Sequence, residues 1–273
     1  MNFTKMQGTG NDFVVIEDLE GKYENLEEIA KKLCNRHFGI GADGILVVRK
    51  SSIADLQMVI INADGSYASM CGNGIRCFAK YIWEKKYVTS NSIKIETGDG
   101  VKLASIDVKD GIFKGVTINM GRYNFDPKSI PALAEEQIIN KKIEIKGKEY
   151  SITSMLMGVP HTIVFGGVDQ YMVQEGEVIE KFELFPQKTN VNFCHVVDKN
   201  TIRVKTWERG AGPTLACGTG SCASVVAASR LGYVEGQVTV HVPGGLLYIE
   251  IVNDEVLMEG PAEITFEGQF FIN

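Results

Sequence analysis

The sequence predicts an α+β fold made of two copies of one domain, and three observations support this. Two Cys-Gly-x-Gly stretches, residues 71–74 and 217–220, each precede a segment with the hydrophobicity of a helix. The two cysteines are 146 positions apart, and the turn glycines Gly100 and Gly245 are 145 apart. Strand patterns surround both helices in the same order. We therefore expect a tandem duplication, with each cysteine placed where a loop enters a helix.

The first half is expected to hold strands and two helices. Apolar residues after Cys71 recur at the i, i+3, i+4, i+7 and i+8 positions, which predicts a helix with one buried face. A shorter helix is predicted over 27–33. The predicted strands span 3–6, 13–16, 45–48, 56–61, 92–96 and 101–106, the last two joined by a tight turn.

The second half repeats this order. A strand over 201–207 leads to Cys217, and residues 223–228 are small and apolar all round, which predicts a helix buried on every side. A hairpin follows, with strands over 238–242 and 246–251. A segment around 123–143, rich in charge and proline, is expected to connect the two domains.

Composition narrows the class of protein. The chain is 44% hydrophobic and 23% charged with a net charge of −6, which is typical of a globular protein and disfavours nucleic acid or an anionic membrane as partner. We find no signal peptide and no run long enough to span a bilayer, so a cytoplasmic protein is expected. The six cysteines are then expected to be reduced thiols, and no closely spaced Cys or His set indicates a metal.

The position of the two cysteines predicts their chemistry. A helix N-terminus presents unpaired N–H groups that attract an anion and lower the pKa of a thiol, and glycines let the anion approach the backbone. We expect a pseudo-twofold axis that places the loops of Cys71 and Cys217 across one cleft. One thiolate and one thiol could then remove a proton from one face of an amino acid and return one to the other, which inverts the α-carbon. Two alternatives are an amino-acid-binding protein without turnover and a thiol redox switch.

Seven motifs extend this interpretation. The sequence is similar to the diaminopimelate epimerase family at residues 7–13 (QGTGNDF), 62–66 (NADGS), 70–74 (MCGNG), 207–212 (WERGAG), 216–220 (ACGTG), 242–245 (VPGG) and 260–262 (GPA). The resemblance implies two pseudo-symmetric domains, each a central helix wrapped by a mostly antiparallel sheet. They would span residues 1–118, completed by 263–273, and 119–262. It also implies epimerisation without pyridoxal phosphate, metal or other cofactor, and a homodimer.

The resemblance assigns roles to individual residues. Cys71 and Cys217 would be the acid/base pair, with His161 and Glu208 as the polar groups that tune them. Glu208 would also receive the substrate's α-amino group. Its α-carboxylate would bind backbone amides of Gly72, Asn73, Gly218 and Thr219, and its distal end would be read by Asn11, Asn62, Asn190 and Arg209.

One position departs from the family pattern. The usual Gly-Asn-Pro-His is here Gly158-Val159-Pro160-His161, so an isopropyl group replaces an amide expected to meet the distal amino-acid group. A polar substrate tail loses a partner when that partner becomes apolar. LL-/meso-diaminopimelate, a precursor of lysine and peptidoglycan, is the favoured substrate. A racemase of another L-amino acid, such as histidine, is the alternative that Val159 raises.

Overall fold

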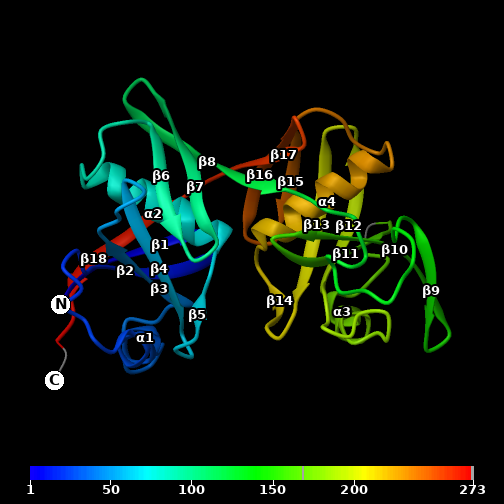
Figure 1. The fold of residues 1–273 in the computed structure, drawn as a ribbon, viewed down its shortest axis with the longest axis horizontal. Coiled ribbons are helices and arrows are strands. Elements are labelled where there is room, and N and C mark those ends of the chain that lie inside the picture. Colours follow the sequence, from blue (N-terminus) through cyan, green and yellow to red (C-terminus); the bar gives the residue numbers. More distant parts are fainter. Residues whose placement is uncertain (168, 272–273) are drawn as a thin grey trace. The chain divides into compact units, whose positions relative to one another are not determined.

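A computed structural model describes residues 1–167 and 169–271 (Figure 1). The chain divides into two compact units: unit 1 comprises Met1–Asn119 and Glu259–Asn273, and unit 2 comprises Met120–Met258. The chain leaves unit 1 within strand β8 (Ile112–Arg122) and returns within β17 (Glu255–Gly260). No helix among the described residues is long and apolar enough to cross a membrane.

Unit 1 is a curved mixed sheet with helix α2 (Gly72–Glu84) packed against it and a second helix, α1 (Leu26–Cys34). Neighbouring strands follow the order β18–β1–β2–β3–β4–β6–β7–β8, with β5 against β4. All of these pairs are antiparallel except β2 with β3 and β4 with β6. The further strands are β1 (Asn2–Gly8), β2 (Asn11–Glu17), β3 (Gly44–Arg49), β4 (Leu56–Asn62), β5 (Tyr67–Ala68), β6 (Ser92–Thr97), β7 (Gly100–Lys109) and β18 (Glu263–Gln269).

Unit 2 repeats this arrangement around helix α4 (Gly218–Arg230). Its strands follow the order β9–β10–β11–β12–β13–β15–β16, with β14 against β13, and the pairs β11 with β12 and β13 with β15 are parallel. The other elements are β9 (Lys141–Ile145), β10 (Lys148–Met157), β11 (Val159–Phe165), the 3₁₀ turn η1 (Val173–Glu175), α3 (Gly176–Glu180), β12 (Asn190–Asp198), β13 (Thr201–Glu208), β14 (Gly212–Thr214), β15 (Val238–Val242) and β16 (Gly245–Val252).

The two units share one strand register, which confirms the duplicated α+β fold. In unit 1, Leu46 of β3 pairs with Ile60 of β4, and in unit 2, Asn192 of β12 pairs with Thr206 of β13. Each residue of the second pair lies 146 positions after its counterpart in the first. The predicted hairpins β1–β2, β6–β7 and β15–β16 are also confirmed.

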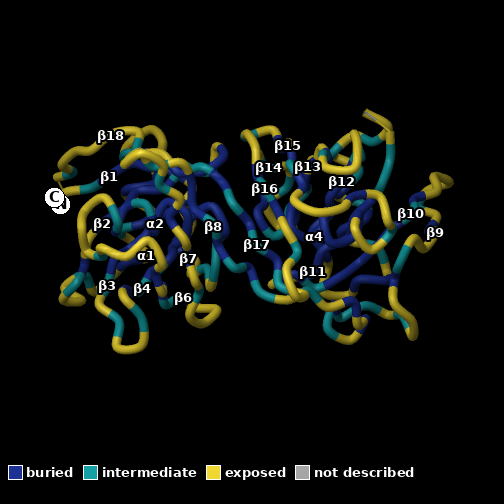
Figure 2. The backbone as a smooth tube through the Cα atoms, turned by 90° about the horizontal axis from the view of Figure 1, so that it is seen from above, coloured by how far each residue is buried: buried dark blue, intermediate teal, exposed yellow. Residues whose placement is uncertain are grey.

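Both central helices are buried along nearly their whole length. For α2 the prediction of one buried face is therefore wrong: Ile75, Phe78 and Ile82 lie in the core as expected, but Arg76 is also fully buried, because its guanidinium donates to backbone carbonyls and to the hydroxyl of Thr9. Helix α4 is buried along nearly its whole length because its residues are small, as predicted (Figure 2). Truncating a fully buried side chain such as Phe78 to alanine costs about 3–5 kcal/mol.

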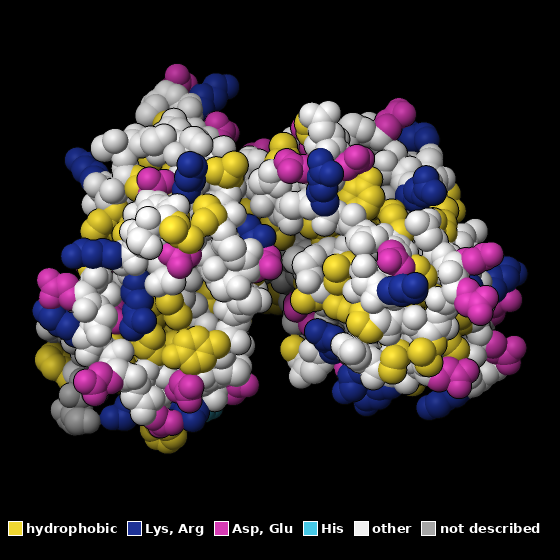
Figure 3. Space-filling view, viewed as in Figure 1, with side chains coloured by type: hydrophobic (Ala, Val, Ile, Leu, Met, Phe, Trp, Pro, Cys, Tyr) yellow, Lys and Arg dark blue, Asp and Glu magenta, His cyan; other side chains and the backbone are white. Residues whose placement is uncertain are grey.

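The predicted connector around 123–143 is wrong. This segment belongs to unit 2, where Ile130 and Ile138 are buried and the backbone of Asn124 pairs with that of Leu156. Its charge and proline gave it the composition of a linker, but its isoleucines anchor it to a core. The crossing is made by strand β8 instead. On the face shown in Figure 3, basic and acidic side chains are interspersed on both units.

Candidate active site

Both predicted catalytic cysteines cap a central helix. Cys71 is the N-cap of α2 and Cys217 the N-cap of α4, each with extended backbone. The Cys71 sulfur accepts the N–H of Gly74 at 3.4 Å, and the Cys217 sulfur accepts that of Gly220 at 3.4 Å. The helix-start prediction is confirmed for both. Gly72, Asn73, Gly218 and Thr219 form the first turns, where backbone N–H groups point out of the helix and favour an anion.

An amide oxygen lies beside the Cys71 thiol. Asn11, at the start of β2, places Oδ1 3.5 Å from the Cys71 sulfur, and the Asn73 amide donates to the same oxygen at 3.3 Å. Asn11 Nδ2 donates to Asp43 Oδ2 at 2.7 Å, which fixes the amide with its oxygen toward the sulfur. The resemblance assigns Asn11 to the distal end of the substrate, and that role stays a prediction. Asn62, at the end of β4, donates to Ser66 Oγ at 2.9 Å.

A charged network holds the loop that carries Asn11. Asp12 accepts from Lys5 and from both terminal nitrogens of Arg36, and Arg36 also pairs with Asp43 at 2.8 Å. Burial of Asp12 acts to raise its pKa, but hydrogen bonds from the two cations outweigh it and lower the pKa to about 2. The carboxylate is therefore charged at neutral pH. Sequence reasoning missed Arg36 and Asp43, although Asp12 lies inside a quoted motif.

A carboxylate lies beside the Cys217 thiol. Glu208, the last residue of β13, hydrogen-bonds the Cys217 side chain and accepts from Thr214 Oγ1 at 2.7 Å. Burial raises the pKa of Glu208, and these two hydrogen bonds oppose the rise. The Thr219 hydroxyl is 3.5 Å from the Cys217 sulfur. Thr214 was not predicted as a site residue. The sequence feature that could have indicated it is a hydroxyl-bearing residue three positions before Cys217.

His161 lies fully buried on β11. Its Nδ1 is 3.2 Å from the side-chain amide nitrogen of Asn192. Burial, with a smaller contribution from the positive charge of Arg209, lowers the pKa of His161 to about 3, so the imidazole is neutral. Asn192 was not predicted as a site residue. Its signal was the alternation that puts Asn190 and Asn192 on one face of a strand.

Asn190 and Arg209 also lie together in unit 2. The Asn190 side-chain oxygen accepts the Arg209 backbone N–H at 2.7 Å, and Arg209 Nη1 donates to the Gln187 carbonyl at 2.9 Å. Val159, the position that departs from the family pattern, begins β11 after Gly158, whose φ of 71° is left-handed. The Val159 side chain is partly exposed.

The other four cysteines are packing residues. Cys34, Cys77, Cys194 and Cys222 are buried, and burial raises the pKa of Cys34 and of Cys77 to about 12. No group of three or more potential metal ligands occurs within the described part of the chain.

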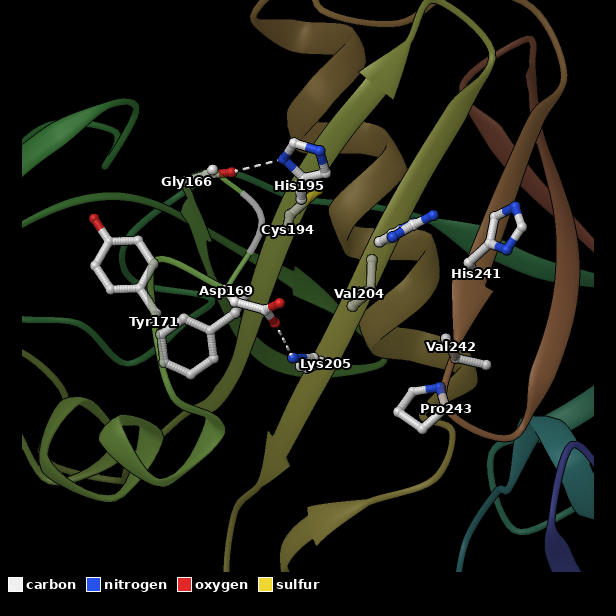
Figure 4. Close-up of a pocket in the computed structure, with 13 residues that line it drawn as sticks. Gly166, Asp169, Tyr171, Cys194, His195, Val204, Lys205, His241, Val242 and Pro243 are labelled. Carbon is white, nitrogen blue, oxygen red and sulfur yellow. Dashed lines mark hydrogen bonds and ion pairs between the residues drawn. The ribbon is translucent and has the colours of Figure 1, made fainter.

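A separate cavity of about 410 Å³ lies on unit 2, on the face of β12 and β13 away from α4 (Figure 4). Cross-strand pairing brings His195, Arg203 and His241 into one row there. The cavity wall contains none of the residues predicted for the active site. It is therefore distinct from the surroundings of Cys217.

Comparison with known proteins identifies the family. The family model described as diaminopimelate epimerase matches residues 3–125 and 153–265. The chain belongs to the diaminopimelate epimerase family. It is 56% identical to a diaminopimelate epimerase of Clostridium perfringens, with 99% of each chain covered, and 48% identical to one of Caldanaerobacter subterraneus subsp. tengcongensis, with 100% of each covered.

Solved structures of more distant proteins share the fold of this epimerase family member. A probable proline racemase from Agrobacterium radiobacter matches with a TM-score of 0.72 at 14% identity, covering 100% of this chain and 93% of that one. A PhzF-family phenazine biosynthesis protein of Bacillus anthracis matches with a TM-score of 0.73 at 17% identity, covering 100% and 99%. At these identities the similarity concerns the fold alone.

Proposed function

We propose that the protein is a diaminopimelate epimerase that interconverts the LL and meso isomers, with Cys71 and Cys217 as its two proton-transfer groups. The observation that carries the proposal is the repeated placement of a thiol at the N-cap of a buried helix. Membership of the family, at 56% identity over nearly the full chain, supports the reaction class and the substrate. The protein is thus an isomerase acting on a small molecule.

The reaction requires a thiolate on one face of the α-carbon and a thiol on the other. The thiolate takes the α-proton, and the second thiol returns a proton to the opposite face of the planar intermediate. In the reverse direction the two groups exchange roles, so they titrate as one coupled pair. The first-turn amides of α2 and α4 stabilise charge that develops on the α-carboxylate, which makes the proton removable in a scheme without a cofactor.

The remaining predicted residues supply orientation. Glu208 receives the α-amino group and accepts a hydrogen bond from the Cys217 thiol. His161 acts as a neutral imidazole because burial lowers its pKa to about 3. Asn62, Asn190 and Arg209 hold the distal end of the substrate. We expect a homodimer in the cytoplasm, without nucleic-acid or membrane partners.

Val159 favours a second candidate, a racemase of another amino acid such as histidine. An apolar group at this position offers no hydrogen bond to a distal amino group. The names of the relatives favour diaminopimelate. The two candidates predict different substrate profiles.

A substrate panel in deuterated buffer tests the proposal. Reduced protein is incubated with LL- and meso-diaminopimelate, histidine and lysine, and α-deuterium is measured together with chiral chromatography. We expect deuterium and isomer interconversion with diaminopimelate far above the rest. Faster exchange with histidine would support the second candidate, and no exchange with any amino acid would refute both. A binding protein would instead show saturable binding that survives Cys71→Ser and Cys217→Ser, and a redox switch would show a functional disulfide.

A further inference from the structure

Three polar side chains form a buried row across neighbouring strands of unit 2. His161 on β11, Asn192 on β12 and Thr206 on β13 are each at most 3% exposed. Thr206 Oγ1 donates to Asn192 Oδ1 at 3.0 Å, and the Asn192 amide nitrogen lies 3.2 Å from His161 Nδ1. The row lies behind the cysteine, because a Cβ built on Gly220 would come 2.2 Å from Asn192 Oδ1 and 3.2 Å from the Cys217 sulfur.

Unit 1 has an apolar row at the same positions. Leu46 and Ile60 pair as Asn192 and Thr206 do, each 146 positions earlier. Phe13 pairs with Gly44 across β2 and β3, as His161 pairs with Asn190 in unit 2.

The apolar row also packs behind its own cysteine. A Cβ on Gly74 would meet Leu46 at 3.2 Å, Phe13 at 3.4 Å and the Cys71 Cβ at 3.4 Å. This fold therefore accepts three apolar side chains behind a cysteine, and packing alone does not explain the polar row of unit 2.

The polar row leaves one nitrogen unpaired. Asn192 and Thr206 satisfy each other, but His161 Nε2 is buried and has no hydrogen-bond partner within the described residues. Burying a polar group without a partner is unfavourable, so such an atom points to a function. No equivalent atom exists in the apolar row of unit 1.

The hydrogen bonds determine which nitrogen carries the proton. Asn192 Oδ1 accepts from Thr206 and faces Gly220, since a Cβ built there would come 2.2 Å from this oxygen. Such a place beside a C–H group suits an oxygen better than an NH₂ group. The Asn192 NH₂ group then faces His161 Nδ1, which must accept. A neutral imidazole that accepts at Nδ1 carries its proton on Nε2.

We propose that Asn192, oriented by Thr206, is a positioning residue that holds His161 as the Nε2–H tautomer, so that this nitrogen donates a hydrogen bond at Cys217's half of the site. The inference rests on the proposed function insofar as His161 serves the reaction. Asn192 itself touches no reacting atom and acts through the imidazole.

The tautomer can be measured directly by ¹⁵N NMR of the histidine rings. The protein has four histidines, and a His161→Gln spectrum assigns the signal of His161. We expect wild-type His161 to be neutral between pH 5 and 8 with its proton on Nε2. In Asn192→Asp the carboxylate can only accept, so the proton should move to Nδ1. Epimerisation kcat should fall about 10- to 100-fold, with a smaller change in KM.

Two further variants allow the same test if Asn192→Asp does not fold. Asn192→Leu copies Leu46 of unit 1 and should leave the tautomer unfixed, and Thr206→Val should give a mixture of tautomers with a smaller loss of kcat. Ser154→Ala removes a buried hydroxyl on β10 outside the row and is the control, expected to keep both the tautomer and kcat.

The outcomes separate this inference from the proposed function. Wild-type protein with the proton on Nδ1, or an Asn192→Asp protein that changes tautomer without losing kcat, would overturn the inference while epimerase activity stands. If no amino acid exchanges its α-proton, the proposed function fails and the role of Asn192 in the reaction fails with it. The wild-type spectrum would still show separately whether Asn192 sets the tautomer.

Discussion

The surroundings of Cys71 and Cys217 share a backbone and differ in chemistry. Each sulfur caps a helix and accepts an N–H from the third residue of that helix at 3.4 Å. The group beside the sulfur is the neutral amide of Asn11 in unit 1 and the carboxyl of Glu208 in unit 2. The duplication thus preserved the position of the thiol, while the side chains around it diverged.

The rows of buried side chains behind the two cysteines also differ, since the row of unit 1 is apolar and the row of unit 2 is polar. Unit 1 places Phe13, Leu46 and Ile60 where unit 2 has His161, Asn192 and Thr206. A buried polar row needs every hydrogen bond satisfied, whereas an apolar row needs only volume. We infer that the two thiols are not interchangeable, although the two directions of epimerisation require both.

The largest expected effect is the loss of epimerisation activity when either capping cysteine is replaced, in contrast to the other thiols. Cys71→Ala and Cys217→Ala should each lower epimerisation by at least about a thousandfold, because each removes a proton-transfer group. The measurement is the rate of isomer interconversion by chiral chromatography. Cys77→Ala and Cys222→Ala, one or two turns into the same helices, are matched controls and should keep nearly full activity. High activity in either capping variant would break the two-base scheme.

The next effect tests the carboxyl beside Cys217. Glu208→Gln should lower kcat about a hundredfold. Because burial raises the pKa of Glu208, the folded protein holds this proton to a higher pH than the unfolded chain. The stability contributed by the protonated group is present below about pH 4.5 and lost as pH rises through the raised pKa. Glu208→Gln should therefore gain stability relative to wild type at neutral pH but not at pH 4. Equal urea midpoints at both pH values would contradict this account.

Most of the fold could be predicted from patterns that are visible along the sequence. The 146-residue interval predicted the duplication, the helical spacing of apolar residues after Cys71 predicted α2, and the run of small apolar residues after Cys217 predicted α4. These signals could be recognised because they lie along the sequence itself. The position of each cysteine at a helix N-terminus could be predicted for the same reason. The function proposed for these cysteines came from the residue type and the family motifs together.

Contacts across long sequence distances could not be predicted. The pairing of Asn11 with Asp43 and of Asn192 with His161 depends on which strands become neighbours, since about 30 residues separate each pair. The segment 123–143 was misplaced because composition does not reveal which of its isoleucines reach a core. The predicted roles of Asn62, Asn190 and Arg209 came from the resemblance and stay predictions.

A smaller expected effect is a loss of folding stability at acidic pH, caused by the buried histidine of the polar row in unit 2. The pKa of His161 is about 3 in the folded protein against about 6.5 unfolded, so the unfolded chain binds the proton first as pH falls. Stability should decline from pH 6.5 toward pH 3 for this reason, by about 2–3 kcal/mol between pH 7 and 4.5. His161→Gln should remove this part of the pH dependence. The measurement is urea unfolding at both pH values, and an unchanged slope in the variant would count against a buried neutral histidine.

The smallest expected effect is a difference in stability between alanine substitutions at two equivalent glycines, Gly220 and Gly74. In Gly220→Ala the new methyl group would lie 2.2 Å from Asn192 Oδ1, which is held by Thr206, so the polar row must shift. Such overpacking costs about 1–3 kcal/mol. In Gly74→Ala the nearest atom is a Leu46 methyl at 3.2 Å, and alanine's helix propensity, about 1 kcal/mol better than glycine's, offsets the crowding. We therefore expect a clear loss of stability in Gly220→Ala and little change in Gly74→Ala.

The measurement is urea unfolding followed by fluorescence. Trp207 lies in unit 2 and Trp83 in unit 1, so variants with a single tryptophan can follow the unfolding of each unit separately. Equal losses in the two variants would mean that the polar row is as deformable as the apolar one.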